Sequence, residues 1–167
     1  MKKNDMAICL WFDDQAEEAV NFYTSIFKDS EIGPTEKATK EGYEFHRKPV
    51  GEALAIEFRL NDMKFLALNG GPLFNFNESV SIMVFCDTQE EIDNYWSKLT
   101  VGGEESMCGW LKDKYGVSWQ IIPSIFNEYI AEGDMEKLER FNKALFKMRK
   151  LIIKDLKNAY EGKTVTV

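Results

Sequence analysis

Few side chains in this sequence of 167 residues are suited to covalent or acid–base chemistry, and they lie far apart. There is one histidine, His46, in a polar segment, and there are three cysteines, Cys9, Cys86 and Cys108. Cys9 and Cys86 lie in predicted strands, where a free cysteine is usually a small buried residue. A nucleophile needs a base within hydrogen-bond reach, and no Gly-x-Ser-x-Gly turn is present. We therefore predict no nucleophilic catalysis, and we interpret His46 as a surface residue.

The polar residue in the most informative position is Gln120. Asp113 to Gly116 is typical of a tight turn, and residues 117–122 form an apolar run that Pro123 ends. Gln120 is the one strongly polar side chain in the middle of this predicted strand. An amide in such a place either satisfies neighbouring backbone groups or contacts a ligand. The sequence leaves both interpretations open.

The composition limits the classes of function. With 44% hydrophobic and 13% aromatic residues, the chain can bury a core within a single domain spanning residues 1–167. Its net charge of −7 argues against binding to nucleic acid or to an anionic membrane, because both need a basic surface. No apolar run approaches the roughly 20 residues of a membrane span, and no signal peptide is recognisable. Together with the odd number of cysteines, which suits a reduced protein, these observations favour a cytoplasmic location.

Two segments of the chain repeat the same order of elements: a strand, a capped helix and antiparallel strands. In the first segment Asp14 is the predicted N-cap, and Glu17 completes a capping box. In the second segment Thr88 and the glutamate three residues later repeat this pattern. The repeat predicts one β-α-β-β-β module in residues 6–72 and another in residues 78–123.

Residues 124–162 follow a helical pattern, with apolar side chains every three or four positions. These side chains include Phe141, Leu145, Met148, Ile152, Ile153 and Leu156. One sheet edge is too small to cover so much apolar surface, so we predict that it forms the interface of a homodimer. The alternative is that these helices fold back over their own sheets.

Five blocks of sequence resemble one protein family. They are Trp11-Phe-Asp-x-Gln-Ala-Glu-Glu-Ala, Ala67-Leu-Asn-Gly-Gly-Pro72, Glu91-x-x-x-Tyr-Trp96, Gly102-Gly-Glu-Glu and Cys108-Gly-Trp-Leu-Lys-Asp-Lys-Tyr-Gly-Val-Ser-Trp-Gln120. The chain resembles the PhnB-like group, often labelled 3-demethylubiquinone-9 3-methyltransferase, of the vicinal-oxygen-chelate superfamily. That superfamily includes glyoxalase I, bleomycin-resistance proteins and extradiol dioxygenases. The resemblance implies an α+β fold: two β-α-β-β-β modules of the glyoxalase/bleomycin-resistance type, with curved mixed sheets, plus C-terminal helices.

The resemblance also implies where a metal would bind. In metal-dependent members each module supplies two ligands, and the last of the four is a Glu that follows an Asp-x-x-Gly turn. The corresponding positions here are Met6, Ala67, Val80 and Gln120. Three of these side chains are apolar and are not usual ligands of zinc, iron or manganese, and His46 could add one ligand at most. We therefore expect no metal and no cofactor.

Strand alternation predicts which side chains share a cavity with these positions. The predicted cavity face carries Ile8, Leu10, Phe12, Phe65, Asn69, Ile82, Val84, Ser118, Gln120 and Ile122. The opposite parity places Trp11, Met83, Phe85, Trp119 and Ile121 against the helices. The predicted ligand-binding residues are Phe12, Asn69, Cys108, Trp110, Ser118 and Gln120.

Two classes of function remain. The first is a metal-free protein that binds or sequesters a small, partly aromatic molecule, as in the bleomycin-resistance branch. The second is a lyase, isomerase or dioxygenase with a rearranged metal site. A methyltransferase needs a nucleotide-binding sheet with a glycine-rich loop after its first strand, and the glycines at 70–71 and 102–103 do not fit that pattern. We therefore reject methyl transfer and predict a small-molecule partner.

Overall fold

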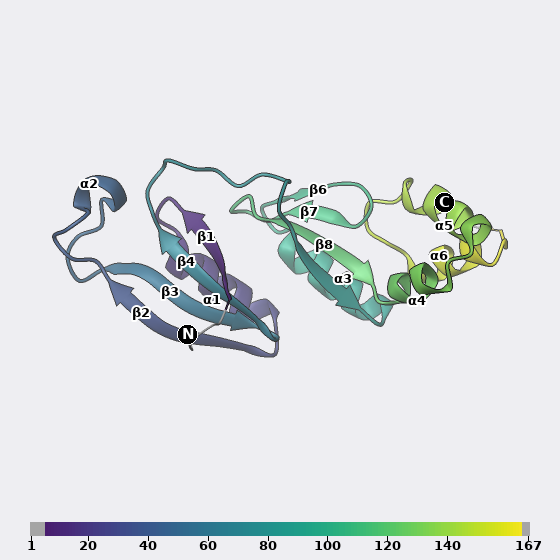
Figure 1. Cartoon of the computed structure of the whole chain (residues 1–167), viewed down its shortest axis with the longest axis horizontal. Coiled ribbons are helices and arrows are strands. Elements are labelled where there is room, and N and C mark those ends of the chain that lie inside the picture. Colours follow the sequence, from purple (N-terminus) through teal and green to yellow (C-terminus); the bar gives the residue numbers. More distant parts are fainter. Residues whose placement is uncertain (1–5, 165–167) are drawn as a thin grey trace. The chain divides into compact units, whose positions relative to one another are not determined.

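The computed structural model describes residues 6–164. Residues 6–76 form one compact unit, and residues 77–164 form a second (Figure 1). Each unit contains a four-stranded mixed sheet together with helices. The predicted α+β fold class is therefore confirmed. The prediction that both units belong to a single domain stays a prediction.

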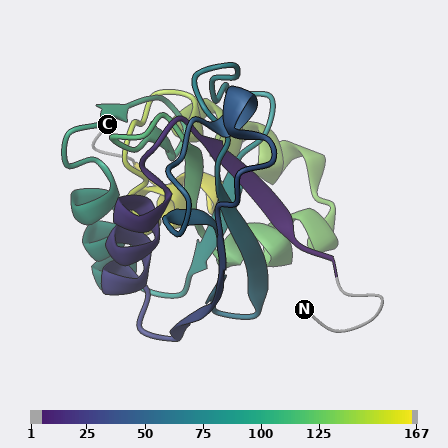
Figure 2. The same cartoon turned by 90° about the vertical axis from the view of Figure 1, so that its left-hand side faces the viewer.

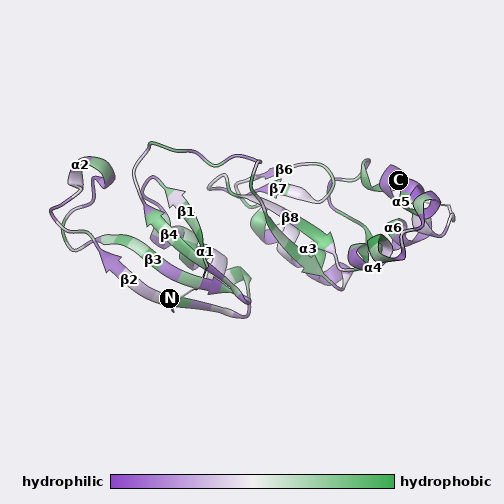
Figure 3. Ribbon diagram, viewed as in Figure 1, coloured by the Kyte–Doolittle hydropathy of each residue, from purple (hydrophilic) through white to green (hydrophobic). Residues whose placement is uncertain are grey.

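The first unit is a sheet with a helix along one of its faces (Figure 2). Its elements are β1 (Ile8–Phe12), α1 (Ala16–Ile26), β2 (Ser30–Lys37), α2 (Tyr43–His46), β3 (Ala53–Leu60) and β4 (Met63–Asn69). The strand order is β1-β4-β3-β2, in which β1 and β4 are parallel and the other neighbours are antiparallel. The edge strand β2 is hydrophilic (Figure 3), as suits a strand with one side open to water.

The second unit repeats this arrangement. Its elements are β5 (Ile82–Cys86), α3 (Gln89–Leu99), β6 (Glu104–Glu105), β7 (Trp110–Lys112) and β8 (Ser118–Pro123), followed by α4 (Ile125–Glu132), α5 (Met135–Leu145) and α6 (Ile153–Tyr160). The strand order is β5-β8-β7-β6, again with a single parallel pair, β5 and β8. The β-α-β-β-β order predicted for each segment is therefore present in both units.

Aromatic packing between α1 and its sheet forms the core of the first unit. The buried Tyr23 of α1 stacks on Phe58 of β3 with ring centroids 6.2 Å apart, and Phe58 stacks on Phe65 of β4 at 5.0 Å. Stacked rings bury much apolar area and fix the helix against the strands. These contacts show that Phe58 and Phe65 lie on the sheet face that α1 covers.

The predicted helix starts had different outcomes. The capping box of α3 is confirmed, because Thr88 and Glu91 exchange both hydrogen bonds. The predicted cap of α1 is wrong. Its N-cap is Gln15, which makes no side-chain capping bond, and Asp14 instead forms an ion pair with Lys48.

The three C-terminal helices bury most of their apolar residues within the second unit. Phe141, Leu145, Met148 and Leu156 lie in a cluster that includes Ile122 at the end of β8. Our sequence argument for a homodimer assumed that these side chains are exposed, so that argument is wrong. Dimerisation itself stays a prediction. Within residues 6–164, every helix is too short or too polar to cross a lipid bilayer.

Candidate functional site

The turn before β8 is built around the carboxylate of Asp113, which is only 3% exposed. Its Oδ1 accepts hydrogen bonds from the N–H groups of Tyr115 (2.9 Å) and Val117 (3.1 Å). Its Oδ2 accepts from Nε1 of Trp119 (2.8 Å). Gly116 closes the turn with a φ of 86°, which favours glycine. Asp113 therefore has a structural role: it fixes the start of β8 and the orientation of Trp119.

The two faces of β8 differ as predicted. Trp119 and Ile121 are fully buried, and the sheet face that carries them packs against α3. Gln120 lies on the opposite face, beside Met83 of β5 and Trp110 of β7. The alternation predicted for this strand is therefore confirmed.

β5 alternates as predicted, but its two faces were assigned the wrong way round. Ile82 and Val84 are buried on the side of α3, whereas Met83 and Phe85 are 45% and 48% exposed on the side of Gln120. The prediction counted alternate residues from Val80, but the strand begins at Ile82. Alternation holds only within a paired strand, so counting through the preceding residues gave the wrong face.

The faces predicted for β1 and β4 in the first unit are also reversed. Phe12 and Asn69 are neighbours on β1 and β4, and both are buried on the face that α1 covers. The amide of Asn69 accepts from the N–H of Ala16 (2.9 Å) and donates to the carbonyl of Ala53 (3.0 Å). Both polar groups of Asn69 thus serve the fold. Phe12 and Asn69 belong to the first unit, and Gln120 belongs to the second.

Two residues placed by that alternation lie on the opposite side of the first sheet. Trp11 was expected against the helix but faces away from it, and its Nε1 donates to the carbonyl of Gly71 (2.8 Å). Cys9 was expected to be buried but is exposed. Both corrections have the same cause, because β1 is apolar on both faces and its composition does not indicate which face is covered.

Ser118 and Cys108 have surroundings that the sequence did not indicate. Ser118 is buried, and its hydroxyl has no hydrogen-bond partner among residues 6–164. Cys108 packs against the C-terminal apolar cluster, and its N–H donates to the carbonyl of Met148 (2.7 Å). Partial burial raises the pKa of the Cys108 thiol above its ordinary value. A thiol of this kind is a packing residue, and a weak nucleophile.

Four side chains on the face of the second sheet opposite α3 form the surface that we call the Gln120 face. They are Met83, Phe85, Trp110 and Gln120. Nε2 of Gln120 donates to Oγ of Ser81 (2.8 Å), which holds the amide in place among the three apolar side chains. Because none of the four side chains ionises near neutral pH, the surface is suited to binding an apolar molecule with one polar group. Met83 and Phe85 were missed as site residues because the sequence argument assigned them to the face of β5 that packs against the helix.

The expectation that His46 lies at the surface is wrong. The side chain is 9% exposed, Nδ1 accepts from the N–H of Lys48 (2.9 Å), and Nε2 is 3.4 Å from the carbonyl oxygen of Glu41. An acceptor Nδ1 requires the neutral ring with its proton on Nε2. The lone pair that could bind a metal is therefore used within the loop.

The donor groups of the structure do not fit a metal site of the usual kind. Across residues 6–164, no group of three or more His, Cys, Asp or Glu residues is placed to hold a metal ion. At the positions that the resemblance assigns to ligands, Ala67 is buried and Met6 and Val80 are exposed apolar residues. Gln120 offers one neutral amide oxygen, a weaker ligand than a carboxylate.

Comparison with known proteins points to one family. The family model described as 3-demethylubiquinone-9 3-methyltransferase matches residues 4–122. A solved structure of a PhnB protein from Bacillus cereus, described by the same enzyme name, is 34% identical, covers 72% of this chain and 100% of its own, and has a TM-score of 0.62. No curated protein matches this chain.

Two further solved structures share the fold at low sequence identity. Protein PA1353 from Pseudomonas aeruginosa is 16% identical over 71% of this chain and 98% of its own, with a TM-score of 0.56. The fosfomycin resistance protein FosX from Listeria monocytogenes is 15% identical over 77% of this chain and 98% of its own, with a TM-score of 0.52. At such identities the similarity shows the fold alone.

Proposed function

Because the chain belongs to the 3-demethylubiquinone-9 3-methyltransferase family, the PhnB-like group of the vicinal-oxygen-chelate superfamily, we propose that it is a metal-free protein that binds a small, partly aromatic molecule on the Gln120 face. The observation that supports this proposal is the position of one amide among three apolar side chains. Met83 and Phe85 remain about half exposed, so a ligand can still bury them.

Each part of the Gln120 face has a separate role in binding. Burial of apolar surface contributes about 25 cal/mol per Å², so Met83, Phe85 and Trp110 supply most of the affinity. The indole of Trp110 offers a flat surface on which an aromatic ring can stack. Gln120, held by Ser81, supplies a hydrogen bond that orients the ligand. Because no side chain of the face titrates, we expect the affinity to change little between about pH 6 and pH 8.

The reaction in the family's name is not part of the proposal. A methyltransferase of the usual kind binds its nucleotide cofactor at a mostly parallel sheet with a glycine-rich turn. Each sheet here has one parallel pair of strands and is otherwise antiparallel. The four positions assigned to metal ligands carry three apolar residues and one amide, which supports a metal-free site.

The location and the assembly of the protein are further parts of the proposal. The three cysteines are free thiols in the structure, which fits a reducing cytoplasm. The net charge of −7 is the reason to expect no nucleic-acid partner. A homodimer now rests on the family resemblance alone, and light scattering tests it: a mass near 19.3 kDa at micromolar concentration contradicts a dimer.

Two measurements test the binding function. Metal analysis of protein purified without a chelator is expected to find zinc, iron and manganese at far less than one ion per chain. A stoichiometric amount of any of them would overturn the metal-free proposal and favour a lyase, isomerase or dioxygenase. Native mass spectrometry of the same sample is expected to detect a small molecule that the Trp110→Ala variant no longer retains. Equal retention by the variant would move the binding site away from the Gln120 face.

A further inference from the structure

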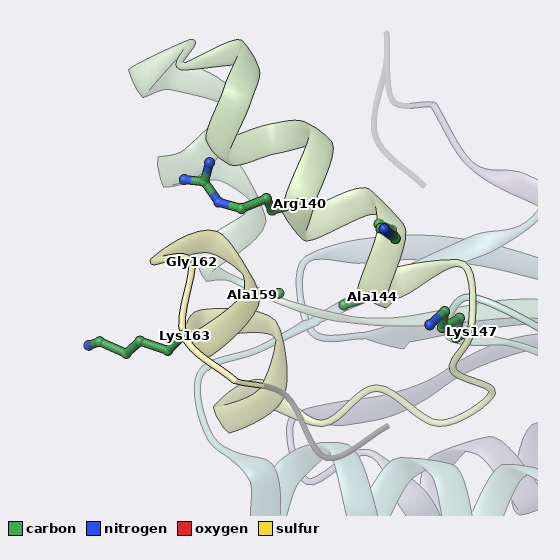
Figure 4. Close-up of a pocket in the computed structure, with 7 residues that line it drawn as sticks. Arg140, Ala144, Lys147, Ala159, Gly162 and Lys163 are labelled. Carbon is green, nitrogen blue, oxygen red and sulfur yellow. The ribbon is translucent and has the colours of Figure 1, made fainter.

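A basic cavity lies in the C-terminal helices, beyond the residues that match the family (Figure 4). It has a volume of about 240 Å³ and a floor of small residues, Ala144, Ala159 and Gly162. Its cationic residues are Arg140, Lys143, Lys147 and Lys163. No acidic residue lines it within the part of the chain that the structure describes, although the whole chain carries a net charge of −7.

Two helices place these cations around one cavity. Arg140 and Lys143 are three positions apart on α5, and so lie on the same side of the helix. Lys147 follows in the closing turn, where its N–H donates to the carbonyl of Ala144 (3.1 Å). At the end of α6, Gly162 has a φ of 71°, and the N–H of the next residue, Lys163, donates to the carbonyl of Asn158 (2.8 Å). This left-handed helix end places Lys163 at the edge of the cavity, where its side chain extends away from Ala144 and Lys147 (Figure 4).

Helix capping explains one of the four cations. Cations are favoured at the C-terminal end of a helix, where the last carbonyl groups carry partial negative charge. Nη2 of Arg140 has this role, because it donates to the carbonyl of Tyr160 (3.0 Å). The ammonium groups of Lys143, Lys147 and Lys163 form no hydrogen bond or ion pair with any residue from 6 to 164. No carboxylate lines the cavity beside these exposed ammonium groups, so an anion that enters it meets positive charge.

We propose that this cavity binds a small molecule that carries two phosphate groups. A phosphate group carries about −1.5 to −2 charges at neutral pH, so two of them balance the four cations of the cavity. Lysine and arginine are the usual phosphate ligands of proteins. A volume of about 240 Å³ holds roughly eight water molecules at about 30 Å³ each, which is room for a diphosphate.

Two larger anions fit the surroundings less well. Nucleic acid binds along an extended basic surface, whereas the groove that Lys163 shares with Lys154 and Lys157 also carries Asp87, Glu128 and Glu161. An anionic membrane attracts a surface of uniformly positive charge. The groove beside the cavity, lined by Met135, Leu138 and Phe146, also carries Glu136 and Glu139. These carboxylates would be repelled by acidic lipid headgroups.

Pyrophosphate tests the site directly in the purified full chain. Isothermal titration calorimetry is expected to show one saturable site whose affinity falls as the salt concentration rises. Lys147→Gln and Lys163→Gln are each expected to weaken binding by about tenfold, because each removes a charged hydrogen-bond donor. Lys98→Gln is the matched control, since it neutralises an exposed lysine in the last turn of α3. It should leave the affinity within about twofold.

Three results would overturn the proposal. The first is the lack of saturable binding by the wild-type chain. The second is an equal loss of affinity in Lys98→Gln, which would mean that pyrophosphate responds to net charge alone. The third is retention on phosphatidylserine vesicles that pyrophosphate does not reverse, which would assign the cluster to lipid headgroups. The substituted residues Lys98, Lys147 and Lys163 are all exposed. If a variant has the far-ultraviolet circular dichroism spectrum of the wild-type chain, a loss of binding is not a loss of folding. The proposal does not depend on the function of the Gln120 face.

Discussion

The helices that cover the two sheets begin in different ways, although the strands around them pair alike. α3 satisfies its own first turn, because Thr88 Oγ1 accepts from the N–H of Glu91 (3.2 Å) and Glu91 Oε2 accepts from the N–H of Thr88 (3.1 Å). α1 depends on a distant residue instead. The N–H of Ala16 donates to the side chain of Asn69, at the end of β4.

The strand registers explain this difference. Asn69 is paired with Phe12 at the end of β1, and Pro123 is paired with Cys86 at the end of β5. Asn69 and Pro123 are thus in equivalent positions of the two sheets. In each unit the next residue donates its N–H to the carbonyl of that partner, at 2.9 and 2.8 Å. Proline has no side-chain acceptor, so the second unit needs a cap within the helix itself.

The largest effect is expected at Trp119, which is fully buried in the second unit. Trp119→Ala removes the indole and its bond to Asp113, so the free energy of unfolding should fall by about 3–5 kcal/mol. Gln120→Ala, at the adjacent residue on the Gln120 face, should lower it by less than about 1 kcal/mol. Urea unfolding followed by circular dichroism measures both changes. The reverse order would mean that the two faces of β8 have been assigned wrongly.

The next effect tests the distant cap of the first unit. Asn69→Ala leaves the buried N–H of Ala16 and carbonyl of Ala53 without their partners. The free energy of unfolding should fall by about 2–4 kcal/mol in urea melts. The control is Asn142→Ala, which removes an exposed amide of α5 and should cost less than about 0.5 kcal/mol. If the two variants lose equal stability, α1 does not depend on Asn69.

A smaller effect is expected when Thr88, the N-cap of α3, is compared with Asp14, the residue that the sequence predicted as the N-cap of α1. Thr88→Ala should lower the free energy of unfolding by about 1 kcal/mol, and Thr88→Ser should recover most of it. Asp14→Ala removes an ion pair with Lys48, and Asp14 is largely exposed, so its effect should be below about 1 kcal/mol. Thermal and urea melts compare the three variants. If Asp14→Ala costs more than Thr88→Ala, the two helix starts are not as different as the structure indicates.

Interactions between residues near in sequence were the ones that could be predicted. The capping box of α3 and the turn at Asp113 each lie within a few residues. The hairpin between β3 and β4, which turns at Asn61 with a φ of 49°, was found for the same reason. With the repeat, these local features predicted the two β-α-β-β-β modules, and the family resemblance added the fold class.

The candidate sites could not be predicted in full because they depend on contacts between distant residues. Asn69 and Ala16 are 53 positions apart, so no local pattern links them. β5 is apolar on both faces, so its sequence does not show which side α3 covers. The basic cavity combines one lysine in α5 and one just after it with a third beyond α6, and no motif relates the two helices. Each of these features depends on how distant residues pack together, which the local order of residues does not indicate.

The last prediction compares the cysteines in the first strand of each unit and involves no change in stability. Cys9 is exposed, whereas Cys86 is buried. Burial, and then the nearby carboxylates of Glu91 and Asp87, raise the pKa of the Cys86 thiol to about 12. At pH 8 the reactive thiolate of Cys86 is then about one part in 10⁴.

Iodoacetamide should therefore modify Cys9 at least about tenfold faster than Cys86, as measured by mass spectrometry of tryptic peptides. The unfolded protein in urea is the control, because both thiols should then react at similar rates. Equal rates in the native protein would show that β5 does not hold Cys86 on the buried side of its sheet.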